Sequence, residues 1–284
     1  MKGLIFAIEE FAVFDGEGIR VNVFFKGCPL RCKWCHNPEG WNGKVQIVKN
    51  PNGCMQCGIC KNVCESPESC SLCGKCIVNC PRNLIRKSGE WYSADELANK
   101  LLKFEKILKI SGGGLTFSGG EVISQAEFLC EVLDKTSALH RIIETSGYGN
   151  SNMFKEVLKR VDFVYYDLKI MDSKKHKEYT GVSNELILEN AKFLFESGVP
   201  CVVRVPFIHS VNTDAENLMA LCEFIKCANN VEKVEFLMYN KLAGAKYKLA
   251  GLDYEYDFHQ PSNDDLKLAD KILKEYGIQY SVSK

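Results

Sequence analysis

The chain has 284 residues, enough for one sizeable hydrophobic core or for such a core with a small insert. Lys plus Arg and Asp plus Glu each total 36, and the resulting net charge of zero argues against a protein that mainly binds nucleic acid. No apolar run is long enough to span a membrane, and the N-terminus carries no signal-peptide cleavage pattern, so we expect a cytoplasmic protein.

The first predicted elements are a strand within the N-terminal run MKGLIFAIEE and a second strand at Val21–Phe25. From residue 93 onward, starting with the capping box Ser93-Ala-Asp-Glu96, the apolar pattern alternates between helix and strand periods. The strands expected there are Leu115–Ser118, Arg141–Glu144, Phe163–Asp167, Cys201–Val205 and Val234–Met238, followed by a last short strand. The helices expected between them are Ala126–Leu133, Met153–Lys159, Glu185–Ser197, a segment from Thr213 toward Cys227, and Asp264–Tyr276.

Six strands separated by helices predict parallel βα units, because a helical crossover returns the chain to the same end of the sheet. A complete barrel needs eight units in about 250 residues. The expected fold is therefore α/β, a partial (β/α)6 barrel formed by residues 1–43 and 93–284. Residues 44–92 interrupt the pattern with eight cysteines and several Pro and Gly, and we interpret them as a small insert folded around metal.

The chain contains fifteen cysteines. In a chain of this length with no export signal, they favour metal ligands over a disulfide framework. Eleven of them lie between Cys28 and Cys80 at short intervals. We expect the other four to be buried as small hydrophobic side chains: Cys130, Cys201, Cys222 and Cys227.

The first group, Cys28, Cys32 and Cys35, has gaps of three and then two residues. Three thiolates at these gaps can hold three irons of a [4Fe–4S] cluster and leave the fourth iron open to a small molecule. The alternative is a structural zinc site that takes its fourth ligand from His36 or from a distant residue.

The second group repeats one spacing within the insert, with gaps of two, two and three residues in each run. This is the pattern of two-cluster ferredoxins, in which the fourth cysteine of each run binds the other cluster. By that rule the two ligand sets are Cys54, Cys57, Cys60 and Cys80, and Cys70, Cys73, Cys76 and Cys64. Glu65 stands where the first run would carry Pro, and only five residues separate Cys64 from Cys70, which leaves the exchange of fourth ligands open. A pair of zinc knuckles is the alternative.

Together these motifs resemble those of the radical S-adenosylmethionine (SAM) superfamily, and more narrowly the activating enzymes of glycyl radical enzymes that carry a ferredoxin-like insert. The resemblance covers nearly the whole chain. Phe14-Asp-Gly-Glu-Gly-Ile-Arg20 is similar to the family's His-Asp-Gly-Pro-Gly-x-Arg segment, with Phe14 in place of His and Glu17 in place of Pro. Phe24-Phe-Lys-Gly27 leads into the cysteine loop. Three further segments resemble the family's Gly-Gly-Glu, Asp-x-Lys and Pro-Tyr-His motifs: Ser118-Gly-Gly-Glu121, Asp167-Leu-Lys169 and Met238-Tyr-Asn240.

The resemblance and the strand ends together imply the cofactor-binding residues, which are Trp34, His36, Gly119, Gly120, Glu121, Glu144, Thr145, Asp167, Lys169, Arg204 and Asn240. Lys169 offers a positive charge, and Asp167 offers oxygens to hydroxyls or to a monovalent cation beside SAM. Asn240 keeps a hydrogen-bonding group but not the family's titratable imidazole. Asp15 and Arg20 are expected to contact the partner protein.

Most of these residues fall at or just past the carboxyl end of a predicted strand. The segments are Gly119–Glu121, Glu144–Thr145, Asp167–Lys169, Arg204 and Tyr239–Asn240. Active sites of parallel βα barrels collect at that face. A structural role could account for any one of these residues, but five segments at one rim indicate a shared site.

The function that the resemblance implies is that of an activating enzyme. It would cleave SAM reductively and use the 5′-deoxyadenosyl radical to remove a Cα hydrogen from a glycine of a partner glycyl radical enzyme. Three [4Fe–4S] clusters, SAM and a flavodoxin or ferredoxin donor would serve this chemistry in a monomeric enzyme of an anaerobic bacterium. The partner stays open among dehydratases of hydroxyproline or glycerol, choline lyases and arylacetate decarboxylases. The alternatives are a radical SAM enzyme acting on a small molecule or peptide, and a ferredoxin-type electron carrier.

Overall fold

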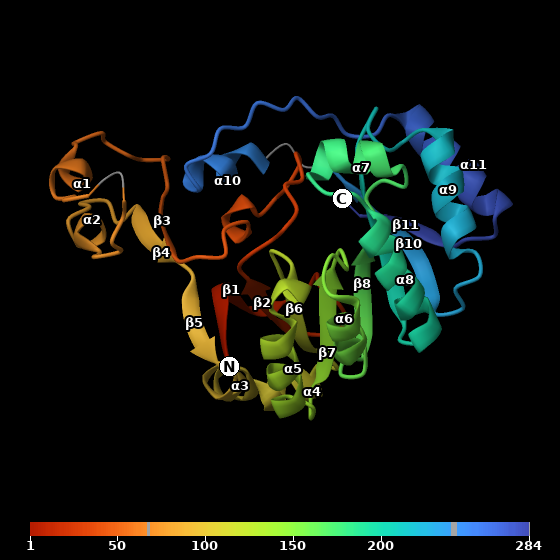
Figure 1. Ribbon diagram of the computed structural model, residues 1–284, viewed down its shortest axis with the longest axis horizontal. Coiled ribbons are helices and arrows are strands. Elements are labelled where there is room, and N and C mark those ends of the chain that lie inside the picture. Colours follow the sequence, from red (N-terminus) through yellow and green to blue (C-terminus); the bar gives the residue numbers. More distant parts are fainter. Residues whose placement is uncertain (67–68, 240–242, 284) are drawn as a thin grey trace.

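The computed structural model describes residues 1–66, 69–239 and 243–283 (Figure 1). The strands in those ranges form a main sheet and a separate two-stranded sheet. The strands are β1 Lys2–Ala12, β2 Arg20–Phe25, β3 Gln46–Lys49, β4 Ile85–Ser88, β5 Glu90–Ser93, β6 Gly114–Gly119, β7 His140–Thr145, β8 Phe163–Asp167, β9 Cys201–Phe207, β10 Val231–Met238 and β11 Tyr280–Ser283.

The helices mostly connect successive strands of the main sheet. They are α1 Ile59–Asn62, α2 Lys75–Val78, α3 Ala94–Leu102, α4 Glu105–Ile110, α5 Ala126–Lys135, α6 Ser151–Leu158, α7 Ser173–Thr180, α8 Glu185–Ser197, α9 Ala215–Ile225, α10 Ala243–Leu249 and α11 Asn263–Glu275, with 3-10 turns at Pro38–Gly40 and Val122–Gln125. Across the described residues, no helix combines the length and the apolar character needed to cross a membrane.

The main sheet is mixed, with the order β11-β10-β9-β8-β7-β6-β2-β1-β5. From β2 to β11 neighbouring strands are parallel, whereas β1 runs antiparallel to both β2 and β5. The six predicted parallel strands are confirmed as β2 and β6 to β10, and β11 adds a seventh. The structure therefore has the α/β organisation that the sequence predicted.

The order of the parallel strands follows the chain without a reversal. Because βαβ crossovers are right-handed, such an order places every connecting helix on the same face of the sheet. Figure 1 shows α5, α6 and α8 following one another along that face. Alternate strand residues such as Phe117, Ile143 and Val203 are buried against these helices in the main core. The opposite face is left for polar side chains.

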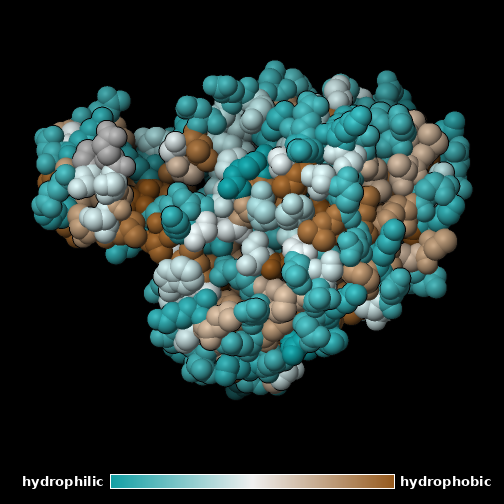
Figure 2. All heavy atoms as spheres, viewed as in Figure 1, coloured by the Kyte–Doolittle hydropathy of each residue, from teal (hydrophilic) through white to brown (hydrophobic). Residues whose placement is uncertain are grey.

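The cysteine-rich segment forms a small lobe that stands away from the sheet, on the left of Figure 1. Its β3 and β4 pair antiparallel, and α1 and α2 each follow a glycine with left-handed φ, Gly58 and Gly74. Figure 2 shows apolar side chains gathered where this lobe meets the body. The sequence assigned residues 90–92 to the insert. In the structure they belong to the main sheet, because β5 pairs with β1.

The four cysteines outside the clustered region do not all behave as predicted. Cys130, Cys201 and Cys222 are buried, but Cys227 is exposed. Cys227 follows the end of α9, and the apolar stretch on which the prediction relied ends with that helix. Burial was therefore the wrong expectation for this residue.

Arg20, expected at the partner protein, is fully buried. Its Nε donates to Thr116 Oγ1 (2.6 Å) and its Nη2 to the Leu115 carbonyl (2.6 Å). Burial lowers its pKa to about 10. Arg20 and the half-buried Asp15 lie at the amino end of the parallel strands, and the Asp15 carbonyl accepts from Thr116 Oγ1 (2.9 Å). A buried guanidinium cannot touch a partner, so this expectation is corrected for Arg20, which holds the loop before β2 in place.

Replacing Arg20 with Met should lower the free energy of unfolding by about 2–4 kcal/mol, because buried acceptors would lose their donors. Urea denaturation measures the difference. The control, Lys159→Met, removes a cation whose side chain is 66% exposed and should change stability by less than about 1 kcal/mol. A wild-type denaturation midpoint together with weakened binding of a partner protein would instead support direct contact by Arg20.

Candidate active site

A cavity of about 370 Å³ opens at the carboxyl ends of the parallel strands. Its wall contains the loop after β2 and the ends of β6 to β10. Ten of the eleven predicted cofactor-binding residues line it, together with the first three cysteines: Trp34, His36, Gly119, Gly120, Glu121, Glu144, Thr145, Asp167, Lys169 and Arg204, with Cys28, Cys32 and Cys35. The eleventh, Asn240, lies outside the described residues. The structure thus brings segments separated by almost 180 residues to one cavity.

The loop that carries these three cysteines is anchored to the end of α7. The backbone N–H of Arg31 donates to the Thr180 carbonyl (2.6 Å), and that of Lys33 donates to the Tyr179 carbonyl (2.9 Å). Leu30 is buried in a second, smaller apolar cluster beneath the loop. These contacts hold the cysteines over the strand ends.

All three thiols of the loop are free, and burial raises the pKa of each above its ordinary value, that of Cys32 to about 12. Buried thiols of this kind ionise only when a cation compensates the charge. Three such donors facing one cavity therefore fit a metal cluster as their ligand.

Gly119 and Gly120 allow the loop after β6 to pass against the chain that leads into the cysteines. A Cβ on Gly120 would lie 2.5 Å from the Gly27 carbonyl oxygen, and one on Gly119 would lie 2.4 Å from the Phe25 nitrogen. Gly119 also has φ +118°, a conformation that favours glycine. The close approach lets the Gly120 N–H donate to the Phe25 carbonyl (2.7 Å).

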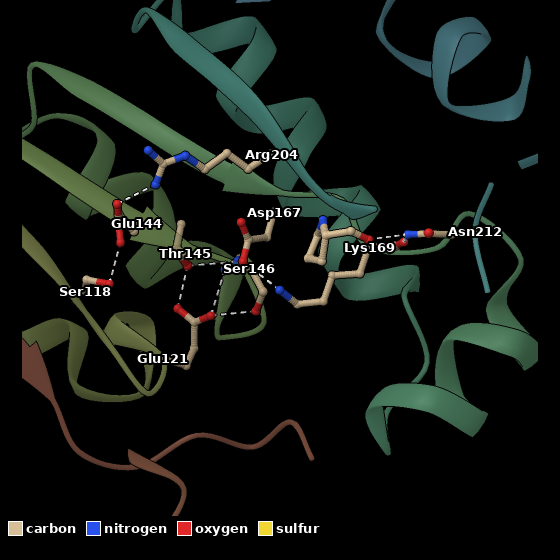
Figure 3. Close-up of polar contacts among 11 residues, drawn as sticks. Ser118, Glu121, Glu144, Thr145, Ser146, Asp167, Lys169, Arg204 and Asn212 are labelled. Atoms are coloured by element: carbon tan, nitrogen blue, oxygen red, sulfur yellow. Dashed lines mark hydrogen bonds and ion pairs between the residues drawn. The ribbon is translucent and has the colours of Figure 1, made fainter. Parts of the chain in front are cut away.

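Glu121 joins the loop after β6 to the loop after β7. Its buried carboxylate accepts from the hydroxyl of Thr145, from the backbone N–H of Ser146 (2.9 Å) and from the Ser146 hydroxyl (2.5 Å), as Figure 3 shows. It also accepts from the Ile123 N–H (3.1 Å), and its own N–H donates to the Gly27 carbonyl (2.9 Å). Burial raises the pKa of Glu121, while the hydrogen bonds from Ser146 and Thr145 oppose this rise.

Arg204 on β9 lies between two carboxylates deeper in the cavity wall. Its Nη1 donates to Glu144 on β7 (2.5 Å) and its Nε to Glu235 on β10 (2.7 Å). The guanidinium also lies 3.5 Å from the centre of the Tyr165 ring, and Ser118 donates to Glu144 (2.6 Å). Burial would lower the pKa of Arg204, but the two carboxylates raise it above its ordinary value. This network ties β6, β7, β9 and β10 together.

Asp167 and Lys169 follow one another at the end of β8. Lys169 Nζ lies 2.6 Å from Asp167 Oδ2, and its side chain is only 10% exposed, so the pair is not a solvated surface pair. Burial would lower the pKa of Lys169, but the Asp167 carboxylate and the neighbouring cysteine sulfurs raise it. Asn212 donates to the Lys169 carbonyl (2.8 Å) and fixes the backbone there (Figure 3).

Aromatic side chains cover the cysteine loop on its outer side. Trp34 packs edge-on against Phe258, and their ring centres lie 6.0 Å apart. Tyr247 on α10 donates from its hydroxyl to the Cys32 carbonyl (3.3 Å) and packs at a right angle against Trp41. A segment close to the C-terminus thus closes the loop that begins at residue 28.

The insert cysteines gather around two separate cavities. A cavity of about 310 Å³ is lined by Cys54, Cys57, Cys60 and Cys80, and a smaller one of about 20 Å³ is lined by Cys64, Cys70, Cys73 and Cys76. The fourth cysteine of each run therefore lies with the first three of the other run, as in the two predicted ligand sets. Among the residues that the structure describes, no group of three or more His, Cys, Asp or Glu side chains is arranged around a single-ion site.

Sequence reasoning missed Ser146, Glu235 and Tyr247. Ser146 directly follows the predicted pair Glu144–Thr145, so its position past a strand end was a usable signal. Glu235 lies inside a predicted strand, where only the register with β9 shows that it faces Arg204. Nothing in the local pattern around Tyr247 indicates its contact with the cysteine loop.

Comparisons with known proteins agree with this site. Residues 14–188 match a family model described as a 4Fe-4S single cluster domain. The chain is 40% identical to the 4-hydroxyphenylacetate decarboxylase activating enzyme of Clostridium scatologenes, over 90% of this chain and 88% of the relative. It is 36% identical to the trans-4-hydroxy-L-proline dehydratase activating enzyme of Clostridioides difficile, over 94% of each chain. A solved domain of the pyruvate-formate lyase-activating enzyme of Bacteroides vulgatus superposes with a TM-score of 0.52 at 29% identity, covering 61% of this chain and all of that domain.

The fold, the site and these matches define the class of iron–sulfur enzymes that use SAM as a radical source. Within that class, the chain belongs to the family of glycyl-radical-enzyme activating enzymes. Its function is therefore to activate a partner glycyl radical enzyme.

Replacing Arg204 with Gln should lower the free energy of unfolding by about 3–5 kcal/mol, because two partly buried carboxylates would lose their cation. The deficit, measured by urea denaturation, should shrink as the pH falls toward 5. Burial raises the pKa of Glu144, so this carboxyl binds its proton more tightly in the folded state, and stability falls as the pH rises through that pKa.

The control for this variant is Glu144→Gln/Arg204→Gln/Glu235→Gln, which removes all three charges and should recover most of the loss. Equal instability of the single and triple variants would show that the guanidinium acts through packing and not through charge.

Proposed function

We propose that the cavity at the strand ends holds SAM together with a [4Fe–4S] cluster on Cys28, Cys32 and Cys35, and that the insert holds two further clusters. The observation that carries this proposal is that the buried Cys32, the half-buried Cys28 and Cys35, and residues at the ends of β6 to β10 line the same cavity. When bound, the cluster held by the three cysteines would supply one electron for the cleavage of SAM into methionine and a 5′-deoxyadenosyl radical, which would remove a Cα hydrogen from a glycine of the partner.

The residues of the cavity would bind SAM and orient it. Lys169 offers a buried positive charge to the SAM carboxylate, and Asp167 offers oxygens to the ribose hydroxyls or to a monovalent cation. Gly119 and Gly120 let the loop after β6 pack against the chain that enters the cysteine loop, and the methionine part would lie beside this loop. Trp34 and its aromatic neighbours exclude water from the cysteine loop.

Arg204 would contribute less directly than its resemblance to the family suggested. Its Nε and Nη1 are engaged by Glu235 and Glu144, so only Nη2, which donates to no residue in the described part of the chain, is left for SAM. We expect Glu121 to act through the loops that it joins, because its carboxylate already accepts four hydrogen bonds. His36 and Thr145 complete the wall, and Asn240 is proposed to lie beside it.

The remaining proposals concern architecture and partners. The parallel strands would form the partial (β/α)6 barrel of residues 1–43 and 93–284, and residues 44–92, apart from β5, the ferredoxin-like insert. The insert clusters would relay electrons from a flavodoxin or ferredoxin. The relatives are named for 4-hydroxyphenylacetate decarboxylase and trans-4-hydroxy-L-proline dehydratase, and we propose that the partner here is a glycyl radical enzyme of this kind. We expect the activating enzyme to act as a monomer.

The direct test of the function is anaerobic incubation of the reduced, iron-loaded enzyme with SAM and candidate partners. A glycyl radical in the partner's EPR spectrum, formed together with 5′-deoxyadenosine, is the expected result. Formation of 5′-deoxyadenosine with small molecules or peptides, and no radical on any partner, would favour the alternative substrate class. No SAM cleavage at all would favour an electron carrier.

The number of clusters can be counted chemically. Three [4Fe–4S] clusters correspond to about twelve irons per chain after anaerobic reconstitution, and replacing Cys28, Cys32 and Cys35 with Ala should remove about four. Cys54→Ala and Cys80→Ala should perturb the same cluster signal, because both side chains line one cavity. Stoichiometric, tightly bound zinc in anaerobically purified protein would contradict the assignment.

Lys169→Ala should weaken SAM binding by one to three orders of magnitude, roughly 1.4 kcal/mol for each order. The reason is that the cavity would lose the cation at the end of β8, whereas the other cation of its wall, Arg204, is engaged by two carboxylates. Equilibrium binding of labelled SAM measures the change, and iron content should stay at the wild-type value.

Lys175→Ala serves as the control, because Lys175 pairs with Asp214 on the surface and should leave SAM binding unchanged. The double variant Asp167→Asn/Lys169→Ala contains no unpaired carboxylate at residue 167. SAM binding should be weak in this variant as well, because the cation is still missing. Wild-type SAM affinity in both Lys169 variants would mean that SAM binds elsewhere.

A further inference from the structure

The insert and the body carry opposite charges, although the whole chain is neutral. Residues 44–92 contain seven Lys and Arg against three Asp and Glu, whereas the rest of the chain contains 29 against 33. Counted on these side chains alone, the insert is positive by four charges and the body negative by four. Because two bound clusters with four thiolate ligands each would offset this excess, the position of the exposed cations matters more than the total charge.

The positive charge of the insert is concentrated around one cavity. Lys49, Lys61 and Arg82 line the cavity of Cys54, Cys57, Cys60 and Cys80, and no Asp or Glu is among its lining residues. Lys61 and Arg82 are exposed. Met55, which is 61% exposed, lines the same cavity and adds an apolar surface between the cations. We call Lys49, Met55, Lys61 and Arg82 the basic rim.

The second insert cavity has a different surface. Glu65 and Lys75 both line it and form an ion pair, so their charges cancel. Arg86, elsewhere in the insert, is paired with Glu39. Of the two insert cavities, only the first is therefore lined by cations that no carboxylate in its own lining offsets.

The basic rim also lies beside the part of the body that reaches the first cysteine loop. Cys54 lines a common cavity with the last two residues of α10, Lys248 and Leu249, and with the two residues that follow the helix. Tyr247 on the same helix donates to the Cys32 carbonyl. A short protein path therefore leads from the rim, through α10, to the active-site loop.

We propose that the basic rim is the docking surface for an acidic, flavodoxin-type electron-transfer protein. The inference rests on the proposed function, since it requires a cluster in the cavity below the rim. The reduced flavin would lose one electron and become the neutral semiquinone, and the oxidised cluster would gain that electron, with no proton exchanged. Complementary charge around a small apolar centre suits fast and transient association.

The test is a stopped-flow measurement of semiquinone formation when photoreduced flavodoxin is mixed with oxidised, iron-loaded enzyme. Lys61→Glu/Arg82→Glu should slow this reaction more than tenfold at low salt and remove its salt dependence. Reduction by photoreduced deazariboflavin, a small donor, should keep its wild-type rate. The neutral variant Lys61→Gln/Arg82→Gln should slow semiquinone formation by a smaller factor. It replaces the charge-reversal variant in the test if that variant does not fold.

The matched control is Lys44→Glu/Lys87→Glu, which makes the same change in net charge at two exposed insert residues outside the rim. Equal slowing in the control would assign the effect to overall charge and overturn the proposal. So would an unchanged rate in the rim variant, or weaker binding of the glycyl radical enzyme with normal reduction. Iron analysis separates these results from failure of the proposed function: about four irons in the wild-type enzyme would mean that the insert holds no clusters.

Discussion

The segment Gly119-Gly120-Glu121 joins the three strand ends on which the active site depends. Its backbone passes within hydrogen-bonding distance of the chain that enters the cysteine loop, and only glycines fit there. Its carboxylate then fixes Thr145 and Ser146 after the next strand. A loop of three residues therefore sets the distance between the cysteines on one side and the β7 end on the other.

The sheet supplies the second constraint. Because its parallel strands follow the chain order without reversal, the helices cover one face and the carboxyl ends meet at one edge. The uncovered face can then hold charged side chains, of which Arg204 with its two carboxylates is the best connected. The same network that ties the strands together engages two nitrogens of Arg204, which leaves less of its guanidinium for the contact with SAM that we propose. Stability and binding thus draw on the same polar groups, as is common in active sites.

Much of this arrangement could be predicted from the sequence, because its signals are local. Cysteine gaps, strand periods and the positions of Glu121, Asp167 and Lys169 at strand ends all depend on residues close to one another in the chain. The burial of Arg20, the pairing of Glu235 with Arg204 and the contact of Tyr247 with Cys32 depend on long-range packing instead. No short motif records such contacts. Asn240 stays a prediction, because it lies outside the described residues.

We propose that one iron of the cluster on the first cysteine loop is left open for SAM. Electron–nuclear double resonance of the reduced, iron-loaded enzyme with SAM labelled in its carboxylate and amino groups tests this claim most directly. Hyperfine coupling of both labels to the cluster is the expected result, and both couplings should be lost in the variant with Cys28, Cys32 and Cys35 replaced by Ala. Absence of coupling in wild-type enzyme that is saturated with SAM and fully loaded with iron would contradict it.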